Sequence, residues 1–192
     1  GIGAVIYTAK VKPGSSVVVF GLGGIGLNVL QGARMAGAGM IVGVDLNPAR
    51  KALAEKFGMT HFVNPKEVEG DLVAHLVNLT KGGADYTFEA TGNVAVMRQA
   101  VEAAREAWGL ATMCGVAGRG ELLEIIPRFL ITGRRVTGSS FGGVKGRSQL
   151  PGLIDRWLAG EYDAASLISH RLTLDEVNHG FDLMHHQDGI RS

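Results

Sequence analysis

The stretch "VVVFGLGGIG", residues 17–26, constrains the fold more than any other part of the sequence, because four apolar residues lead directly into four glycines within six positions. Gly21, Gly23 and Gly26 match G-x-G-x-x-G between a predicted strand and a predicted helix, the context in which this motif binds dinucleotides. In that interpretation Gly21 permits a tight turn, Gly23 admits a pyrophosphate against the main chain, and Gly26 lets helix and strand pack closely. A glycine-rich connection without a ligand is the alternative.

An acidic residue at the end of the next predicted strand favours the dinucleotide site. Asp45 follows Gly26 by 19 residues, close to the spacing of about 20 expected for a carboxylate that accepts hydrogen bonds from the adenosine ribose. The 2′-phosphate of NADP would meet a like charge there, so the sequence predicts NAD. Arg50 lies nearby and could contact the ribose, pair with a 2′-phosphate or be solvated.

Short apolar runs alternate with stretches of helical periodicity, which is typical of strand-helix-strand units around a parallel sheet. The predicted strands are residues 15–20, 40–45, 61–64, 84–90, 109–116 and 135–143, and the predicted helices are 24–38, 47–58, 67–80, 94–107, 148–160 and 174–186. With right-handed crossovers, this order predicts an α/β fold: a doubly wound, parallel, six-stranded sheet (Rossmann fold) with helices on both faces.

The size and charge of the chain are those of one domain with a small ligand. The 192 residues are 46% hydrophobic and carry 19 basic against 18 acidic residues, so we expect one domain, 1–192, without a nucleic-acid or membrane partner. The only cysteine, Cys114, excludes an intramolecular disulfide and favours a reducing, cytoplasmic setting. The six histidines lack a ligand spacing, so we assign no metal site. Without an initiator methionine, the sequence is interpreted as a fragment.

Several segments resemble the cofactor domain of zinc-dependent medium-chain alcohol dehydrogenases, and most of all the class III group, the glutathione-dependent formaldehyde dehydrogenases. These segments are "TAKVKPGSSVVVFGLGGIGLNVLQGARMAGA", "IVGVDLNPAR", "FGMTHFVNP", "TGNVAVMRQAVEAA", "GSSFGG" and the closing "GIRS". The resemblance spans nearly the whole chain without gaps. The segments "AAREAWG" and "PRFLITGR" depart from the class III pattern, which puts glutathione use in doubt.

The resemblance also implies a set of residues around the cofactor. Gly21, Leu22, Gly23, Gly24 and Gly26 would hold the pyrophosphate, with Ile25 behind the nicotinamide. Asp45 and Arg50 would contact the ribose. The segment that would lie beside the nicotinamide is Cys114, Gly115 and Val116, and the one against its carboxamide is Ser139, Ser140 and Phe141. Arg191 would reach the phosphate, and the adenine would lie near Thr91 and Pro65. Cys114 and Phe141 could instead be simple packing residues, and Arg191 a solvated terminal residue.

In the family, zinc activates the alcohol and hydride passes to NAD, and the zinc ligands come from a separate catalytic domain. The resemblance therefore implies hydride transfer from a primary alcohol or S-(hydroxymethyl)glutathione by the parent enzyme, no catalytic residue in this chain, and no activity of the chain alone. It also implies a homodimer through the edge strand 135–141. The alternatives are an NAD-sensing module without catalysis and another medium-chain dehydrogenase, such as an aryl-alcohol dehydrogenase. Ile25 disfavours a methyltransferase, whose loop would want glycine there.

Overall fold

A single parallel sheet organises residues 1–146. The computed structural model describes residues 1–186, 189 and 190. Six strands lie in the order β3-β2-β1-β4-β5-β6, and every neighbouring pair is parallel. The strands are β1 (Ser16–Phe20), β2 (Met40–Val44), β3 (His61–Val63), β4 (Tyr86–Glu89), β5 (Leu110–Met113) and β6 (Arg135–Gly138). The predicted doubly wound α/β fold is confirmed.

The central strands are buried on both faces, which explains their continuous apolar sequences. In β1, Val17 pairs with Ile41 of β2 on one side and Tyr86 of β4 on the other. Val17, Val18 and Val19 are fully buried. The winding direction reverses at β1, because β2 and β3 continue to one side and β4 to β6 to the other. A doubly wound sheet binds ligands beyond the carboxyl ends of its strands at this point.

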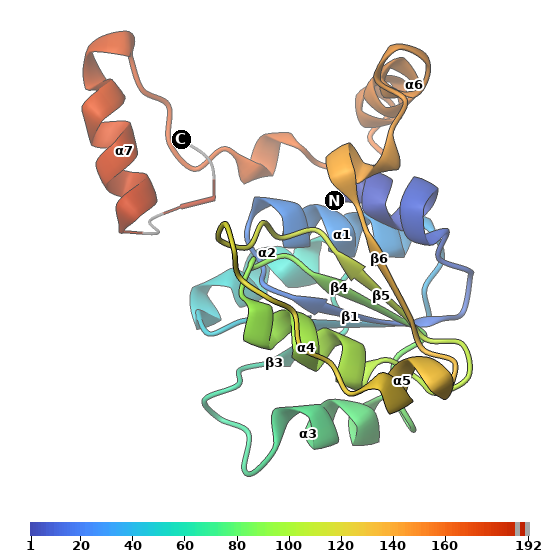
Figure 1. Cartoon of the computed structure of the whole chain (residues 1–192). Coiled ribbons are helices and arrows are strands. Elements are labelled where there is room, and N and C mark those ends of the chain that lie inside the picture. Colours follow the sequence, from blue (N-terminus) through green and yellow to red (C-terminus); the bar gives the residue numbers. More distant parts are fainter. Residues whose placement is uncertain (187–188, 191–192) are drawn as a thin grey trace. The chain divides into compact units, whose positions relative to one another are not determined.

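Helices cover both faces of the sheet (Figure 1). The helices α1 and α2 lie on one face, and α3, α4 and α5 lie on the other. Their bounds are α1 (Gly24–Met35), α2 (Lys51–Lys56), α3 (Leu72–Leu79), α4 (Val94–Ala103) and α5 (Pro127–Ile131). On the α3 and α4 face, Leu76, Ala100 and Ala103 pack against Val18, Phe20, Val42 and Val44 of the sheet.

Four features of this unit differ from the prediction. The helix predicted over 67–80 begins only at Leu72, because Gly70 has φ +84° and Asp71 caps the helix by accepting from the Ala74 N–H at 2.7 Å. The strand predicted over 135–143 stops at Gly138, and a 3₁₀ turn, η3 (Ser140–Gly143), follows it. A π-helical segment, η1 (Ala4–Ala9), and helix α5 were not predicted.

Residues from 147 onward form a second compact unit. It holds most of α6 (Gly146–Leu158), the 3₁₀ turns η4 (Ala165–Leu167) and η5 (Leu174–Glu176), and α7 (Val177–His185), so helices are present where 148–160 and 174–186 predict them. The assignment of 1–192 to one domain stays a prediction. Among the described residues no helix is both long and apolar enough to cross a bilayer.

Candidate functional site

The turn that leaves β1 depends on two glycines. Gly21 has φ +87°, in the left-handed region that glycine adopts without steric cost, and its N–H donates to the carbonyl of Val44 at 2.8 Å. A Cβ atom on Gly26 would lie 1.7 Å from the carbonyl oxygen of Gly21, so only glycine fits there. The chain thus turns sharply out of β1 and directly into α1.

Gly23 differs from Gly21 and Gly26 because it borders open space. It is exposed and precedes α1 with φ −79° and ψ −166°, and a Cβ atom built on it would meet nothing within 4 Å. No side chain caps the helix at this position. The first N–H groups of a helix have no intrahelical partner, and the helix dipole favours an anion beside them. The corner formed by residues 21–26 therefore offers free donors and room for a phosphate group.

Asp45 connects the ends of β1 and β2. Its Oδ2 accepts from the Leu22 N–H at 2.6 Å and its Oδ1 from the Asn47 N–H at 2.8 Å. A carboxylate has about four acceptor positions, so ribose hydroxyls can still donate to it. Asp45 is half-buried, as is Arg50 at the end of the 3₁₀ turn η2 (Pro48–Arg50). The structure thus brings Asp45 into direct contact with the glycine corner.

A buried glutamate that the sequence analysis missed organises the ends of β4 and β5. Glu89 is completely buried; its Oε1 accepts from the N–H and hydroxyl of Thr91 and, at 2.9 Å, from the Gly92 N–H. Its carbonyl accepts from the N–H groups of Cys114 and Gly115 at 2.8 and 3.0 Å. A carboxylate at the end of a predicted strand, two residues before Thr91-Gly92, is the signal that could have identified it.

The predicted nicotinamide segments follow β5 and β6. A Cβ on Gly115 would lie 2.2 Å from the Gly92 nitrogen and 2.6 Å from Oε2 of Glu89, so the two loops touch at main-chain distance. Burial raises the pKa of the Cys114 thiol to about 11, and the Glu89 carboxylate contributes in the same direction. The side chain of Val116 is 90% exposed. Cys114 is half-buried, and its raised pKa keeps the thiol protonated at neutral pH.

The segment after β6 is tied back to β5. Ser139 donates its N–H to the Met113 carbonyl at 2.9 Å, and its hydroxyl lies 2.9 Å from that of Thr8. Ser140 is exposed, and Phe141 is 72% exposed with φ 50°. An exposed aromatic side chain on a left-handed backbone is not core packing. Phe141 therefore does not fill the core, contrary to the alternative weighed from the sequence.

The predicted residues thus gather at one edge of the sheet. Those in residues 1–146 lie at or just beyond the carboxyl ends of β1, β2, β4, β5 and β6, and Pro65 follows β3. Leu22 is fully buried beneath the corner, whereas Ile25 is exposed on α1. Arg191 lies outside the described residues. The described residues contain no group of three or more histidine, cysteine, aspartate or glutamate side chains that could hold a metal ion.

Comparison with known proteins identifies what this chain is similar to. Residues 24–159 match the family described as zinc-binding dehydrogenase. The whole chain is 57% identical to an alcohol dehydrogenase class-3 from Cereibacter sphaeroides and 54% identical to an S-(hydroxymethyl)glutathione dehydrogenase from Paracoccus denitrificans, covering 53% and 52% of their lengths. The chain thus spans about half the length of these relatives.

Solved structures show the same fold. A crystal structure of benzyl alcohol dehydrogenase from Acinetobacter calcoaceticus superposes with a TM-score of 0.92 over 99% of this chain and 52% of that one, at 29% identity. A zinc-binding domain protein of the alcohol dehydrogenase type from Burkholderia ambifaria gives a TM-score of 0.91 over 98% of this chain and 50% of its own, at 32% identity.

Proposed function

Because this chain belongs to the zinc-binding dehydrogenase family, we propose that it is the NAD-binding part of a zinc-dependent alcohol dehydrogenase. The observation that carries the proposal is the open space at Gly23, beside a tight turn at Gly21 and a close helix contact at Gly26. Each glycine thereby has the separate property that a pyrophosphate-binding corner requires. The parent enzyme would oxidise a primary alcohol or S-(hydroxymethyl)glutathione, the adduct in the name of the Paracoccus denitrificans relative.

Residues of this chain would bind and orient the cofactor. The first N–H groups of α1 face the pyrophosphate, and Gly23 lets the main chain approach it. Asp45 accepts from the adenosine ribose while it holds Leu22 and Asn47, so ribose recognition and the shape of the corner depend on one carboxylate. Glu89 fixes Thr91 and Gly92 and, through its carbonyl, the segment that begins at Cys114. When bound, NAD supplies the hydride acceptor.

The parent enzyme would need parts beyond those described here. Its zinc ligands would come from the half of the relatives' length that this chain does not cover, so we propose that the chain binds NAD(H) without oxidising alcohol by itself. We also propose a cytoplasmic setting for the parent enzyme, supported only by this chain, whose one cysteine cannot form a disulfide within it.

The experiment is a calorimetric titration of the chain and its Gly23→Ala variant with NADH and NADPH. The added methyl group meets no protein atom within 4 Å at a φ of −79°, so the variant folds normally but occupies the space reserved for the pyrophosphate. We expect NADH to bind the original chain in preference to NADPH, and its affinity to fall at least tenfold in the variant, about 1.4 kcal/mol.

Gly152→Ala in α6 is the matched control, because a Cβ there also meets nothing within 4 Å. It should leave NADH affinity unchanged. An NADH affinity in Gly23→Ala equal to that of the original chain would refute the corner as the cofactor site. Equal binding of NADH and NADPH would refute the role assigned to Asp45.

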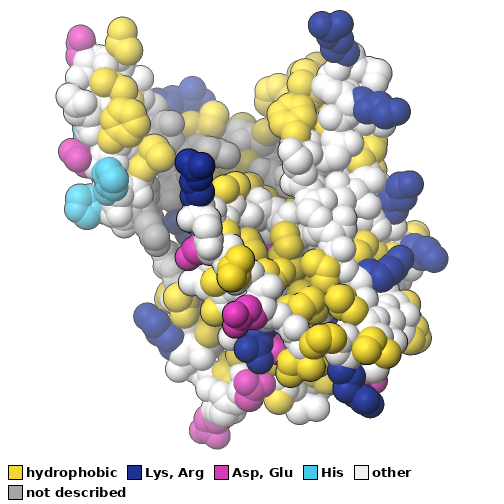
Figure 2. All heavy atoms as spheres, in the orientation of Figure 1, with side chains coloured by type: hydrophobic (Ala, Val, Ile, Leu, Met, Phe, Trp, Pro, Cys, Tyr) yellow, Lys and Arg dark blue, Asp and Glu magenta, His cyan; other side chains and the backbone are white. Residues whose placement is uncertain are grey.

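We also propose that the parent enzyme is a homodimer joined through β6. This strand lies at the edge of the sheet, as predicted, and an unpaired edge can add another strand. Exposed hydrophobic side chains continue from it over α5 and the preceding loop; they belong to Leu122, Ile126, Leu130, Ile131 and Val136. Figure 2 shows hydrophobic side chains over the region where Figure 1 places α5. An apolar patch beside an open edge supports a protein contact there.

A further inference from the structure

A pocket opens at the amino ends of the strands, at the opposite end of the sheet from the glycine corner. This amino-edge pocket has a volume of about 590 Å³ and is lined by the connection between η1 and β1 and by Asp85, Tyr86, Trp108 and Arg135. These four residues stand at or just before the starts of β4, β5 and β6. At about 3.3 Å per residue, β1 separates the pocket from the glycine corner by roughly 13 Å or more. It is therefore a different site from the proposed NAD site.

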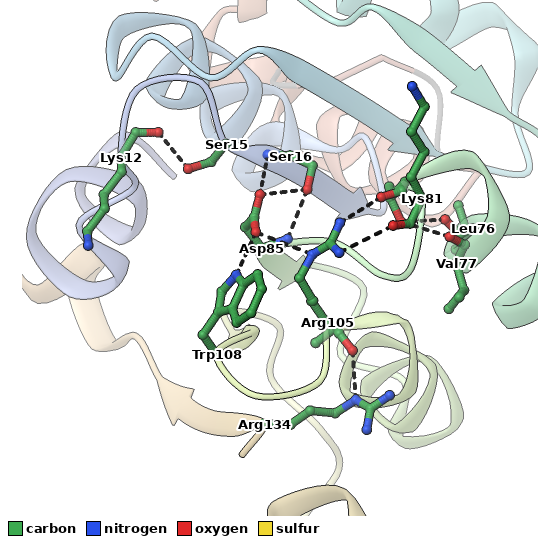
Figure 3. A network of polar contacts seen from close by, with 12 residues as sticks. Lys12, Ser15, Ser16, Leu76, Val77, Lys81, Asp85, Arg105, Trp108 and Arg134 are labelled. Atoms are coloured by element: carbon green, nitrogen blue, oxygen red, sulfur yellow. Dashed lines mark hydrogen bonds and ion pairs between the residues drawn. The ribbon is translucent and has the colours of Figure 1, made fainter. Parts of the chain in front are cut away.

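A polar network fixes one wall of the pocket (Figure 3). Asp85 accepts from the N–H and the hydroxyl of Ser16 at 2.8 and 2.9 Å, and from the indole N–H of Trp108 at 2.8 Å. The guanidinium of Arg105 lies 3.5 Å from the same carboxylate and 5.6 Å from the centre of the Trp108 ring. Burial alone would raise the pKa of Asp85, but these hydrogen bonds and Arg105 lower it. The charge of Asp85 is thus already paired within the protein.

Three further cations line the pocket. Lys10 and Lys12 are exposed on the connection before β1, and the side chain of neither forms an ion pair or hydrogen bond with any described residue. Arg135 donates one N–H to the carbonyl of Trp108 at 2.8 Å and has other donors left. Since Arg105 offsets Asp85, the lining carries a net positive charge. Such a lining attracts anions.

Two aromatic side chains complete the lining. Trp108 is 54% exposed although its indole is held by Asp85 and Arg105. Tyr86 also lines the pocket, and its side chain is buried, with only 7% of the residue exposed. Its hydroxyl forms no hydrogen bond with any described residue. The hydroxyl is nevertheless not a buried unpaired group, and it can exchange hydrogen bonds with water or with a bound molecule.

We propose that the amino-edge pocket binds a small aromatic anion, a planar ring that carries a phosphate or carboxylate group. The ring would lie against Trp108, and the anionic group would be held by Lys10, Lys12 and Arg135. The volume is in the range of small-molecule sites. A bare inorganic anion would contact only the cationic part of the lining, and a neutral aromatic compound only its aromatic part.

Phenyl phosphate is the probe, and the readout is the fluorescence of Trp108 in a Trp157→Phe background, which leaves one tryptophan. With NADH at saturation, so that the glycine corner is occupied, we expect saturable quenching by phenyl phosphate. The affinity should fall about tenfold in the Lys10→Gln/Lys12→Gln double variant, since two exposed ionic contacts are lost. Lys51→Gln, which removes an exposed lysine of α2, is the control and should leave it unchanged.

Several results would overturn the proposal. One is quenching that does not saturate, and another is an equal loss of affinity in Lys51→Gln. Binding of inorganic phosphate or benzyl alcohol as tight as that of phenyl phosphate would show that the ring or the charge plays no part. The pocket and the NAD site are tested separately, because phenyl phosphate binding should also persist in Gly23→Ala, the variant expected to bind NADH more weakly.

Discussion

Gly23 and Gly26 differ in what an added methyl group would meet, so a substitution at Gly26 tests the fold and one at Gly23 tests cofactor binding. A Cβ on Gly26 would lie 1.7 Å from the Gly21 carbonyl oxygen, a distance that only a shift of α1 or of the turn can relieve. We predict that Gly26→Ala lowers the free energy of unfolding by about 3 kcal/mol or more, since overpacking costs about 1–3 kcal/mol even among flexible side chains.

Urea denaturation followed by circular dichroism measures this loss, and Gly23→Ala serves as the control with an unchanged midpoint. A Gly26→Ala chain as stable as the original would mean that the close contact between turn and helix is not needed for the fold.

The thiol of Cys114 yields a prediction that depends on pH. Its pKa in the folded chain is raised to about 11, chiefly by burial, whereas an unfolded cysteine titrates near about 8.5. The thiolate is the reactive form, so alkylation by iodoacetamide should be slow at about pH 8 and accelerate only toward about pH 11. The unfolded chain in urea is the comparison, and its thiol should react at an ordinary rate.

The sign of the linked stability change follows from the same shift. Above about pH 8.5 the unfolded thiol loses its proton before the folded one, so the unfolded state binds fewer protons. The contribution of Cys114 to stability is therefore fully present at lower pH and is lost as the pH rises toward about 11. Equal alkylation rates in the folded and unfolded chain would contradict the burial of this thiol.

Sequence analysis could predict some residues of the candidate site but not others. The glycine corner and Asp45 could be predicted because their spacing reflects a geometric requirement of the ligand. Glu89 was missed because most of its partners are main-chain N–H groups, those of Thr91, Gly92, Cys114 and Gly115, and the one signal in the sequence is a carboxylate at the end of a predicted strand. The assignments of the cofactor-binding residues themselves stay predictions.

At the scale of the elements, the strands were easier to predict than the helix ends. A parallel strand buried on both faces is a continuous apolar run, which made β1 and β2 predictable from the sequence. The outer strands β3 and β6 are mostly exposed and were predicted from their place in the alternation of strands and helices. The start of α3 depends instead on Gly70 and on the cap at Asp71, inside a stretch that is helical in composition. Helix α5, with only five residues, is too short to show a periodic pattern.

The cap of α3 gives a prediction at this scale. Asp71→Ala removes the carboxylate that accepts from the Ala74 N–H at 2.7 Å, and should lower the free energy of unfolding by about 1 kcal/mol. Asp71→Ser, which keeps a capping oxygen, should recover most of that stability. Thermal denaturation measures both. Since α3 contributes no residue to the candidate site, NADH affinity should not change, and a Tm equal to that of the original chain would show that the cap contributes nothing.

At the scale of the whole molecule, the free edge at β6 makes the proposed homodimer testable with one substitution. Arg135 and Ser139 donate their N–H groups inward, to the carbonyls of Gly109 and Met113. Since the N–H groups of successive residues in a strand point alternately to its two lateral sides, the N–H of Val136 points away from β5, toward the free side of the strand. We predict that Val136→Pro in the parent enzyme removes this outward donor, leaves the pairing with β5 intact and yields a monomer.

Sedimentation at micromolar concentration measures the oligomeric state, with Val136→Thr as the control that keeps the N–H group. A parent enzyme that is already monomeric would refute the dimer. A Val136→Pro variant that is folded and still dimeric would place the interface elsewhere.

The contact between Gly21 and Gly26 has a consequence for how the cofactor is received. Since the main chains of the turn and of α1 are in direct contact at these two glycines, the corner is rigid and already has its final shape before any ligand binds. We therefore expect the proposed cofactor to bind this corner by lock and key. Any movement that closes over the cofactor would have to come from segments other than the turn and the start of α1.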